Sequence, residues 1–201
     1  MPPKPAEKLR IIACGAIARE IIAILAANGL RHVELTCLPA ILHNTPDRIP
    51  AEIERELAEA KADGVSKIFI AYADCGTGGL LDRVCEKHGV ERIAGPHCYS
   101  FYAGNDLFES WGEDNMRAFF LTDFLARQFD AFVTKPLGLD RHPELRDVYF
   151  GNYEKLVYLA QSDDPDLDRR ARVAAKKLGL AYERRRTSYG DLDVALQALA
   201  K

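Results

Sequence analysis

Short apolar runs alternate with longer amphipathic segments along most of this chain of 201 residues. The runs have the length and composition of buried strands, and the segments between them place apolar residues at helical spacing. We expect strands at residues 9–13, 32–36, 67–72, 91–94, 155–160 and 180–185. Helices between strands favour right-handed crossovers and a parallel sheet. The pattern predicts a three-layer α/β fold, with a mostly parallel sheet of about five to six strands and helices on both faces.

The sequence predicts a single α/β domain over residues 1–201. Within it we expect a flexible N-terminus at residues 1–8 and an irregular helical insertion at residues 99–150, where the alternation is lost. An aromatic run at residues 116–133 has mostly helical spacing and predicts a buried helix, preceded by a short extended piece. The same run would also suit a dimer surface, so an oligomer stays open.

Composition excludes several classes of partner. The formal net charge is −3, so no overall basic field calls for nucleic acid or an acidic membrane surface. The first five residues are polar and proline-bearing, and no later stretch approaches ~18 consecutive apolar residues. We therefore expect a soluble cytoplasmic protein that acts on a small-molecule substrate. In that reducing compartment its cysteines are free or metal-bound rather than paired in disulfides.

Four of the five cysteines stand where a predicted strand gives out, namely Cys14, Cys37, Cys75 and Cys98. Ligand sites in open parallel sheets form beyond the carboxyl ends of the strands. Residues far apart in the sequence are therefore expected to meet at one edge of the sheet. The fifth, Cys85, lies inside a predicted helix and is expected to be packing.

The strongest site hypothesis uses Cys14, Cys75 and Cys98, each of which has a glycine nearby. Three thiolates with one open position would suit a catalytic zinc, or a four-iron iron–sulfur cluster with one iron left for substrate. Two alternatives remain open from the residues alone. One is a reactive thiol centre, and the other is a set of unliganded cysteines that pack as small hydrophobes. The chain has no Cys-x-x-Cys spacing among these residues to decide between them.

Further candidates surround the cysteines. His43 is the spare fourth ligand or proton carrier, whereas His97 is less suited because binding one ion together with the adjacent Cys98 is strained. Arg19 and Glu20, expected early in the first helix, are candidates to orient the substrate. The simpler alternative is that these two form a solvated ion pair.

A glycine-rich turn follows the third predicted strand and contains Gly76, Thr77, Gly78 and Gly79. Its backbone N–H groups and the following helix N-terminus would suit an anionic group. The turn lacks the Lys-Ser/Thr pair of a P-loop and the spacing of a dinucleotide fingerprint. It is therefore interpreted as an anchor for a carboxylate or phosphate of a small substrate, and as a nucleotide site only weakly. The same helix N-terminus would lower the pKa of Cys75.

Four segments carry a resemblance to a known family. They are Ala-Cys-Gly-Ala-Ile-Ala-Arg-Glu at residues 13–20, Leu-His-Asn at 42–44, Tyr-Ala-Asp-Cys-Gly at 72–76 and Gly-Pro-His-Cys at 95–98. In these segments the chain resembles the bacterial and archaeal family catalogued as domain of unknown function 1638. It departs from the family pattern at Gly15, where the family often has Glu, and in the last segment, which lacks the family's Arg and Asp. It therefore resembles a distinct subgroup.

The resemblance implies a setting rather than a reaction. Members are expected beside corrinoid proteins and methyltransferases, which points to one-carbon, or methyl-group, metabolism. The first hypothesis is a metal- or cluster-binding enzyme or accessory factor, such as a metal-dependent methyltransferase or lyase-type enzyme acting on a small anionic substrate. The second is a chaperone or binding module that hands a metal or cobalamin fragment to a methyltransferase. The third is a nucleotide- or methyl-donor-binding enzyme whose cysteines are purely structural.

Overall fold

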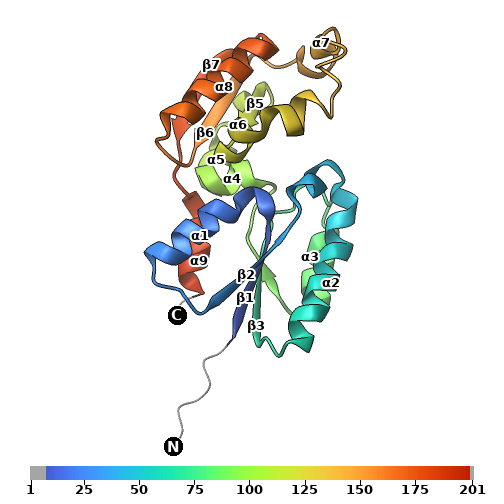
Figure 1. Ribbon diagram of the computed structural model, residues 1–201, viewed down its shortest axis with the longest axis vertical. Coiled ribbons are helices and arrows are strands. Elements are labelled where there is room, and N and C mark those ends of the chain that lie inside the picture. The colour runs from blue at the N-terminus through green and yellow to red at the C-terminus, as the bar shows by residue number, and fades with distance from the viewer. Residues whose placement is uncertain (1–7, 200–201) are drawn as a thin grey trace, which may run out of the picture. The chain divides into compact units, whose positions relative to one another are not determined.

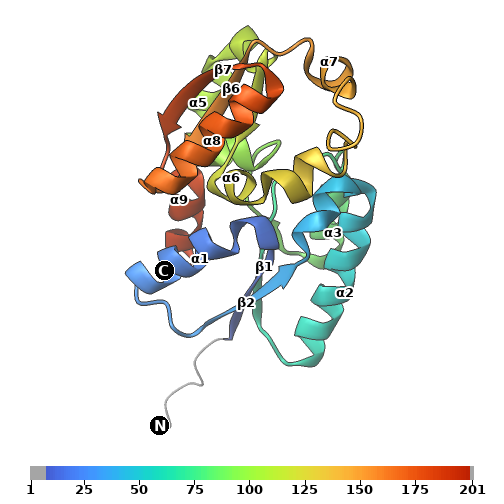
Figure 2. The same ribbon diagram turned by 45° about the horizontal axis from the view of Figure 1, so that its top comes forward.

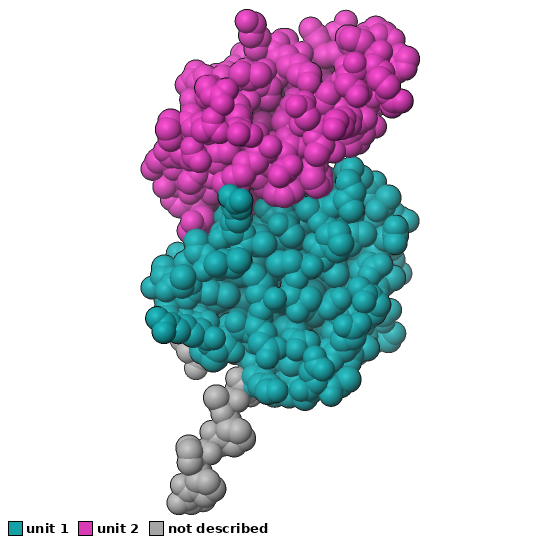
Figure 3. Space-filling model, viewed as in Figure 1, with its two compact units in different colours: residues 1–98, 192–201 teal, residues 99–191 magenta. Residues whose placement is uncertain are grey.

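The computed structural model describes residues 8–199 and divides the chain into two compact units (Figure 3). Residues 1–98 and 192–201 form unit 1, and residues 99–191 form unit 2. Except for Lys8, the expected flexible N-terminus lies outside the described residues. Two compact units can belong to one cooperative domain or to two, so the expected single domain stays a prediction.

Unit 1 is built on a four-stranded parallel sheet with the strand order β2-β1-β3-β4. Its inner strands are rich in aliphatic side chains and almost fully buried, as expected for strands covered on both faces. The strand bounds are Leu9–Cys14 for β1, Val33–Leu38 for β2, Lys67–Ala71 for β3 and Glu91–Arg92 for β4.

Helices cover both faces of this sheet. In both ribbon views α1 (Ala18–Ala27) and α9 (Gly190–Ala198) lie on one side of the strands, with α2 (Ile49–Ala62) and α3 (Leu80–His88) on the other (Figures 1 and 2). The apolar stripes of α2 and α3 pack with strand residues in one buried cluster. Local signals place the helix ends: Pro50 stands in the first turn of α2, and Gly89, with φ +63°, ends α3.

Unit 2 has its own parallel sheet of three strands, in the order β5-β6-β7. The middle strand β6 alternates between two buried faces. Leu156 and Tyr158 pack in the cluster that includes α6 and α8, whereas Val157 and Leu159 pack against an aromatic cluster that includes Phe108. The bounds are Ala118–Leu121 (β5), Lys155–Ala160 (β6), Ala181–Arg186 (β7), Cys98–Ala103 (α4), Asn105–Ser110 (α5), Asp123–Phe129 (α6), Leu145–Phe150 (α7) and Pro165–Leu178 (α8).

The α/β class, the parallel pairing and the helices on both faces are confirmed, but the single sheet is wrong, because the strands belong to two sheets. The expected irregular insertion at residues 99–150 contributes a strand, β5, to the second of them. The short extended piece expected before a helix in its aromatic run is β5, which leads into α6, and a π-helical turn, Asp130–Thr134, follows.

No helix in the described part of the chain combines the length and apolar character needed to cross a membrane.

Candidate functional site

The carboxyl-terminal edge of the sheet in unit 1 gathers sulfur and hydroxyl groups. Strand β1 lies between β2 and β3 and ends at Cys14. Ala13 pairs with Cys37 on β2 and with Ala71, the last residue of β3. Cys14 and Tyr72 each follow one residue further on, so neighbouring strands bring both side chains to the same edge. This convergence is what the strand-end positions of the cysteines predict.

Three thiols at this edge have raised pKa values. Burial raises the pKa of Cys14, against the opposing effects of hydrogen bonds from the Ala16 backbone and from the Tyr72 hydroxyl. Burial and the charge of Cys14 raise the pKa of Cys75 to about 12. Cys37 is exposed on β2, and its pKa is raised by partial desolvation and by the charge of Cys14. Cys14 therefore lies within electrostatic reach of the other two sulfurs, and all three groups are neutral thiols near pH 7.

Tyr72 adds a buried hydroxyl to the thiols. The residue is 2% exposed, and its hydroxyl oxygen makes no hydrogen bond of regular geometry with a described residue. Burial raises the pKa of Tyr72, and the neighbouring Cys14 raises it further. The contact between the two groups favours the charged form of Cys14 and the protonated form of Tyr72, so the Tyr72 hydroxyl and the Cys14 thiol form one polar pair at this edge.

The Asp74 side chain already occupies the hydrogen-bond donors of the glycine-rich turn after β3. The Asp74 carboxylate accepts backbone N–H bonds from Gly76 (3.2 Å), Gly78 (3.2 Å) and Gly79 (2.8 Å), and the Thr77 hydroxyl at 2.7 Å. Partial burial raises the pKa of Asp74, but these bonds outweigh it and the net pKa is lowered. An incoming anion would have to displace Asp74 from these donors. The expected anion anchor at residues 76–79 stays a prediction, and this closure counts against it.

Cys75 stands in this turn with φ +51°, a left-handed conformation that is uncommon outside glycine. Its N–H donates to the carbonyl of Pro96 at 2.8 Å, and the N–H of Asp74 donates to Gly95 at 3.0 Å. These bonds fasten the Cys75 turn to the loop that leads into α4. Cys98, the third predicted ligand, is the half-buried first residue of that helix.

Two histidines lie near each other at the same end of unit 1. His43 is an exposed residue of the 3-10 turn Ala40–Asn44, and partial desolvation of its ring by the surrounding protein lowers its pKa. Burial also lowers the pKa of His97, and the charge of His43 lowers it further. The turn that follows His43 approaches the cysteine turn, since a Cβ added to Gly76 would lie 3.5 Å from Pro46. His43 and His97 are therefore neutral imidazoles near pH 7, close to the loop of Cys75.

The first-helix candidates differ in their surroundings. Arg19 is exposed, whereas Glu20 is only 5% exposed. The alternative of a solvated Arg19–Glu20 pair is therefore wrong for the glutamate. The predicted role of Arg19 and Glu20 in orienting substrate stays a prediction.

The described residues bring part of the predicted ligand set together. Cys14 and Cys75 lie within electrostatic reach, and Cys37, expected only as a spare ligand, joins them. Over residues 8–199, however, no group of three or more His, Cys, Asp or Glu side chains is arranged to hold a metal ion. The donor chemistry suits a soft metal, but a three-ligand geometry is not preassembled. Tyr72 was not predicted, although its place directly after a buried strand was a usable signal.

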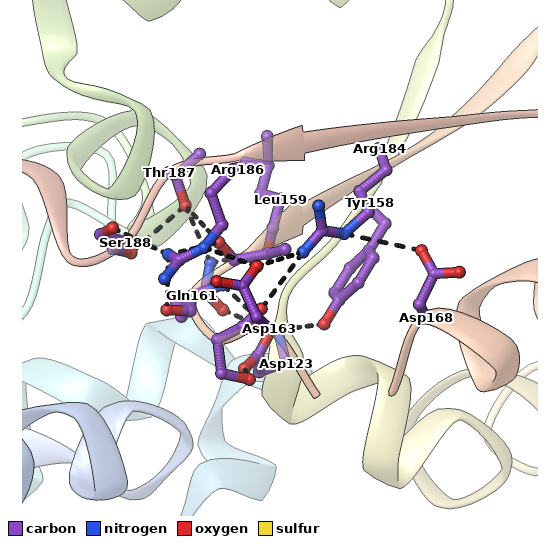
Figure 4. A network of polar contacts seen from close by, with 12 residues as sticks. Asp123, Tyr158, Leu159, Gln161, Asp163, Asp168, Arg184, Arg186, Thr187 and Ser188 are labelled. Carbon is purple, nitrogen blue, oxygen red and sulfur yellow. Dashed lines mark hydrogen bonds and ion pairs between the residues drawn. The ribbon is translucent and has the colours of Figure 1, made fainter. Parts of the chain in front are cut away.

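A second polar cluster lies at the carboxyl-terminal edge of the sheet in unit 2 (Figure 4). Asp123, 1% exposed, follows β5 and accepts hydrogen bonds from the Tyr158 hydroxyl at 2.6 Å, the Gln161 N–H at 3.1 Å and the Ser162 hydroxyl at 2.5 Å. Burial and the bond to Asp123 raise the pKa of Tyr158. Asp123 was not predicted as a site residue, because the aromatic run at residues 116–133 was interpreted as a helix buried in the core.

Arginines extend this cluster on β7. Arg184 and Arg186 both donate to one oxygen of Asp163, at 2.7 Å and 2.9 Å (Figure 4). The guanidinium of Arg185 lies 4.0 Å from the centroid of the Trp111 ring. These arginines therefore fasten strand ends and loops rather than only facing solvent.

Two parallel α/β units, each with polar groups at the carboxyl-terminal edge of its sheet, define the class of this protein. The chain belongs to the family described as Protein of unknown function (DUF1638), whose model matches residues 37–196. This match includes Cys37, His43, Cys75 and Cys98 but begins after Cys14. No curated protein and no solved structure matches the chain.

Proposed function

We propose that this chain is a metal- or iron–sulfur-binding protein of methyl-group metabolism, with its centre at the carboxyl-terminal edge of the sheet in unit 1. The observation that carries the proposal is the convergence of Cys14, Cys75 and Cys37 at one edge of the sheet, with the buried hydroxyl of Tyr72 beside Cys14. In metal-free protein the three cysteines are neutral thiols, because their surroundings oppose ionisation. A bound cation favours the thiolate form, so metal binding at this edge would release protons.

Cys14, Cys75 and Cys98 would hold the metal centre, with Cys98 brought in by the loop that is bonded to the Cys75 turn. His43 is the proposed proton carrier, because it is neutral near pH 7 and lies near this loop. A zinc ion or a four-iron cluster with one open position would supply a Lewis acid for a small anionic substrate. Completing the set requires a local shift, since the described residues offer no ready group of three ligands.

The biological setting rests on the family resemblance. A methyltransferase or lyase-type activity, a corrinoid protein or methyltransferase as partner, and a cytoplasmic location all belong to this proposal. An accessory role, in which the centre or a cobalamin fragment is handed to a methyltransferase, uses the same cysteines without catalysis.

One observation favours a competing function, in which the cysteines are structural and the protein binds a nucleotide or methyl donor. Cys14 and Cys75 pack against the apolar cluster of α2, α3 and the central strands, as unliganded cysteines do. Metal-free protein that binds a nucleotide would establish this alternative.

The test is metal analysis of protein purified without oxygen. We expect about one zinc per chain in colourless protein, or about four irons in brown protein with sulfur-to-iron absorption. Cys14→Ser, Cys75→Ser and Cys98→Ser should each empty the site. Cys85→Ser is the matched control, because Cys85 is a buried packing residue on α3. Metal-free wild type, or equal loss in the control when it is folded, would refute the proposal.

A further inference from the structure

A basic groove in unit 2 is independent of the cysteine site. It has a volume of about 340 Å³ and lies between α6 with its π-helical turn and α8. Its apolar lining includes Phe129 and the exposed Val173. Its charged lining consists of five cations and one carboxylate, namely Arg127, Lys135, Arg169, Arg170, Lys177 and Asp130. The volume falls in the range of small-molecule sites, and the charge selects for anions.

The cations of the groove are incompletely neutralised. Arg169 and Arg170 share Asp166, and the ammonium group of Lys177 lies 3.1 Å from Asp130. Lys135 forms no ion pair with any residue in the described part of the chain. The ion pairs of Asp130 and Asp166 involve exposed side chains and are therefore weak. A bound anion can compete with these two carboxylates for the groove cations.

One groove cation forms an ion pair with a buried carboxylate. The Arg127 guanidinium lies 3.7 Å from Asp123, the buried carboxylate at the carboxyl-terminal edge of the sheet. The groove therefore borders the edge at which parallel sheets bind their ligands. The helix that carries Arg127 is also irregular, because Gln128 leaves helical geometry and the π-helical turn Asp130–Thr134 follows. Irregular turns of this kind are frequent at functional sites.

We propose that this groove binds a small, multiply charged phosphate compound. Guanidinium groups match phosphate oxygens in pairs, and the groove presents three of them, from Arg127, Arg169 and Arg170. Two ammonium groups add positive charge: Lys135 follows the π-helical turn, and Lys177 lies on α8. The apolar lining leaves room for an organic portion of the ligand.

The test measures pyrophosphate binding to the full chain by calorimetry at low salt. We expect saturable binding with a Kd below about 1 mM, weakening as salt rises. Lys135→Gln and Arg170→Gln remove exposed groove cations, and each should raise the Kd about three- to tenfold. Lys176→Gln is the matched control, since Lys176 is exposed on α8 but does not line the groove.

Citrate separates phosphate recognition from general anion binding, and pyrophosphate should bind more tightly than citrate. The proposal is overturned by absent or unsaturable pyrophosphate binding, or by tighter binding of citrate. It is equally overturned when either groove variant binds as well as wild type, or when Lys176→Gln loses as much affinity as they do. None of these outcomes depends on metal in unit 1.

Discussion

Replacing Asp74 by alanine should unfasten the turn that positions Cys75. The Asp74 carboxylate is the common acceptor for the N–H groups of Gly76, Gly78 and Gly79 and for the Thr77 hydroxyl. With Asp74→Ala all four donors lose their acceptor. The chain around Cys75, which is held in a left-handed conformation, then loses its internal support.

The magnitude follows from which donors water can reach. The N–H groups of Gly76 and Gly78 belong to exposed residues, so water replaces their lost partner at little cost. The Thr77 hydroxyl is on a residue that is 4% exposed, and the bond from Gly79 is partly buried. Two bonds to a charged acceptor at about 1.5–3 kcal/mol each give a loss of about 3–6 kcal/mol in the free energy of unfolding, towards the lower end because Asp74 is half-buried.

Urea unfolding of wild type and Asp74→Ala at pH 7 measures this loss. Asp47→Ala is the control, because Asp47 is an exposed carboxylate in the same unit and lies outside the turn. The folded-state pKa of Asp74 is lowered, so its contribution is complete above the ordinary carboxyl pKa of about 3.9. The wild-type advantage should therefore shrink as the pH falls below about 4 towards the folded pKa. A loss below about 0.5 kcal/mol at pH 7, or one equal to that of Asp47→Ala, would refute the reasoning.

Three further changes test other parts of the structure by urea unfolding. Tyr72→Phe removes a buried hydroxyl that contacts the Cys14 thiol without regular hydrogen-bond geometry, and should change the stability of metal-free protein by less than about 1 kcal/mol; a larger loss would show that this contact is a strong hydrogen bond. Asp123→Ala strands buried donors and should cost at least about 3 kcal/mol, against less than about 1 kcal/mol for the exposed Asp163→Ala; equal losses would contradict the burial argument. Gly15→Ala would set a Cβ 2.9 Å from the Leu38 carbonyl oxygen and should cost about 1–3 kcal/mol, so an unchanged stability would show that this contact relaxes freely.

Local signals predicted most of the elements. Residues 155–160 form β6 as expected, because a continuous apolar run between polar turns is sufficient to define a buried strand. Helix α8 begins after Asp164, whose side chain accepts the N–H of Asp166, and ends at Gly179 with φ +67°. Both ends follow from capping chemistry that acts within a few residues.

Such local signals could not predict that the strands divide into two sheets. Strand β5 has only four residues, Ala118–Leu121, inside an aromatic run whose spacing also fits a helix. Parallel strands pair across long crossovers, so which strand joins which sheet depends on contacts that no short window of sequence contains.

The candidate site was predictable in outline only. The rule that ligand sites follow strand ends located Cys14 and Cys75 at one edge. It gave Cys37 only the role of a spare ligand, because the parallel register that sets Cys37 beside Ala13 is not visible in the sequence. The closure of the glycine turn by Asp74 was also missed, since it depends on the backbone path of the turn rather than on composition.

X-ray absorption at the metal edge of anaerobically purified protein tests the central claim most directly. We predict about three sulfur neighbours, at about 2.3 Å for zinc, and loss of the bound metal after Cys75→Ser or Cys14→Ser. A first shell of oxygen and nitrogen without sulfur, or a metal content and sulfur count that neither substitution changes, would contradict the claim.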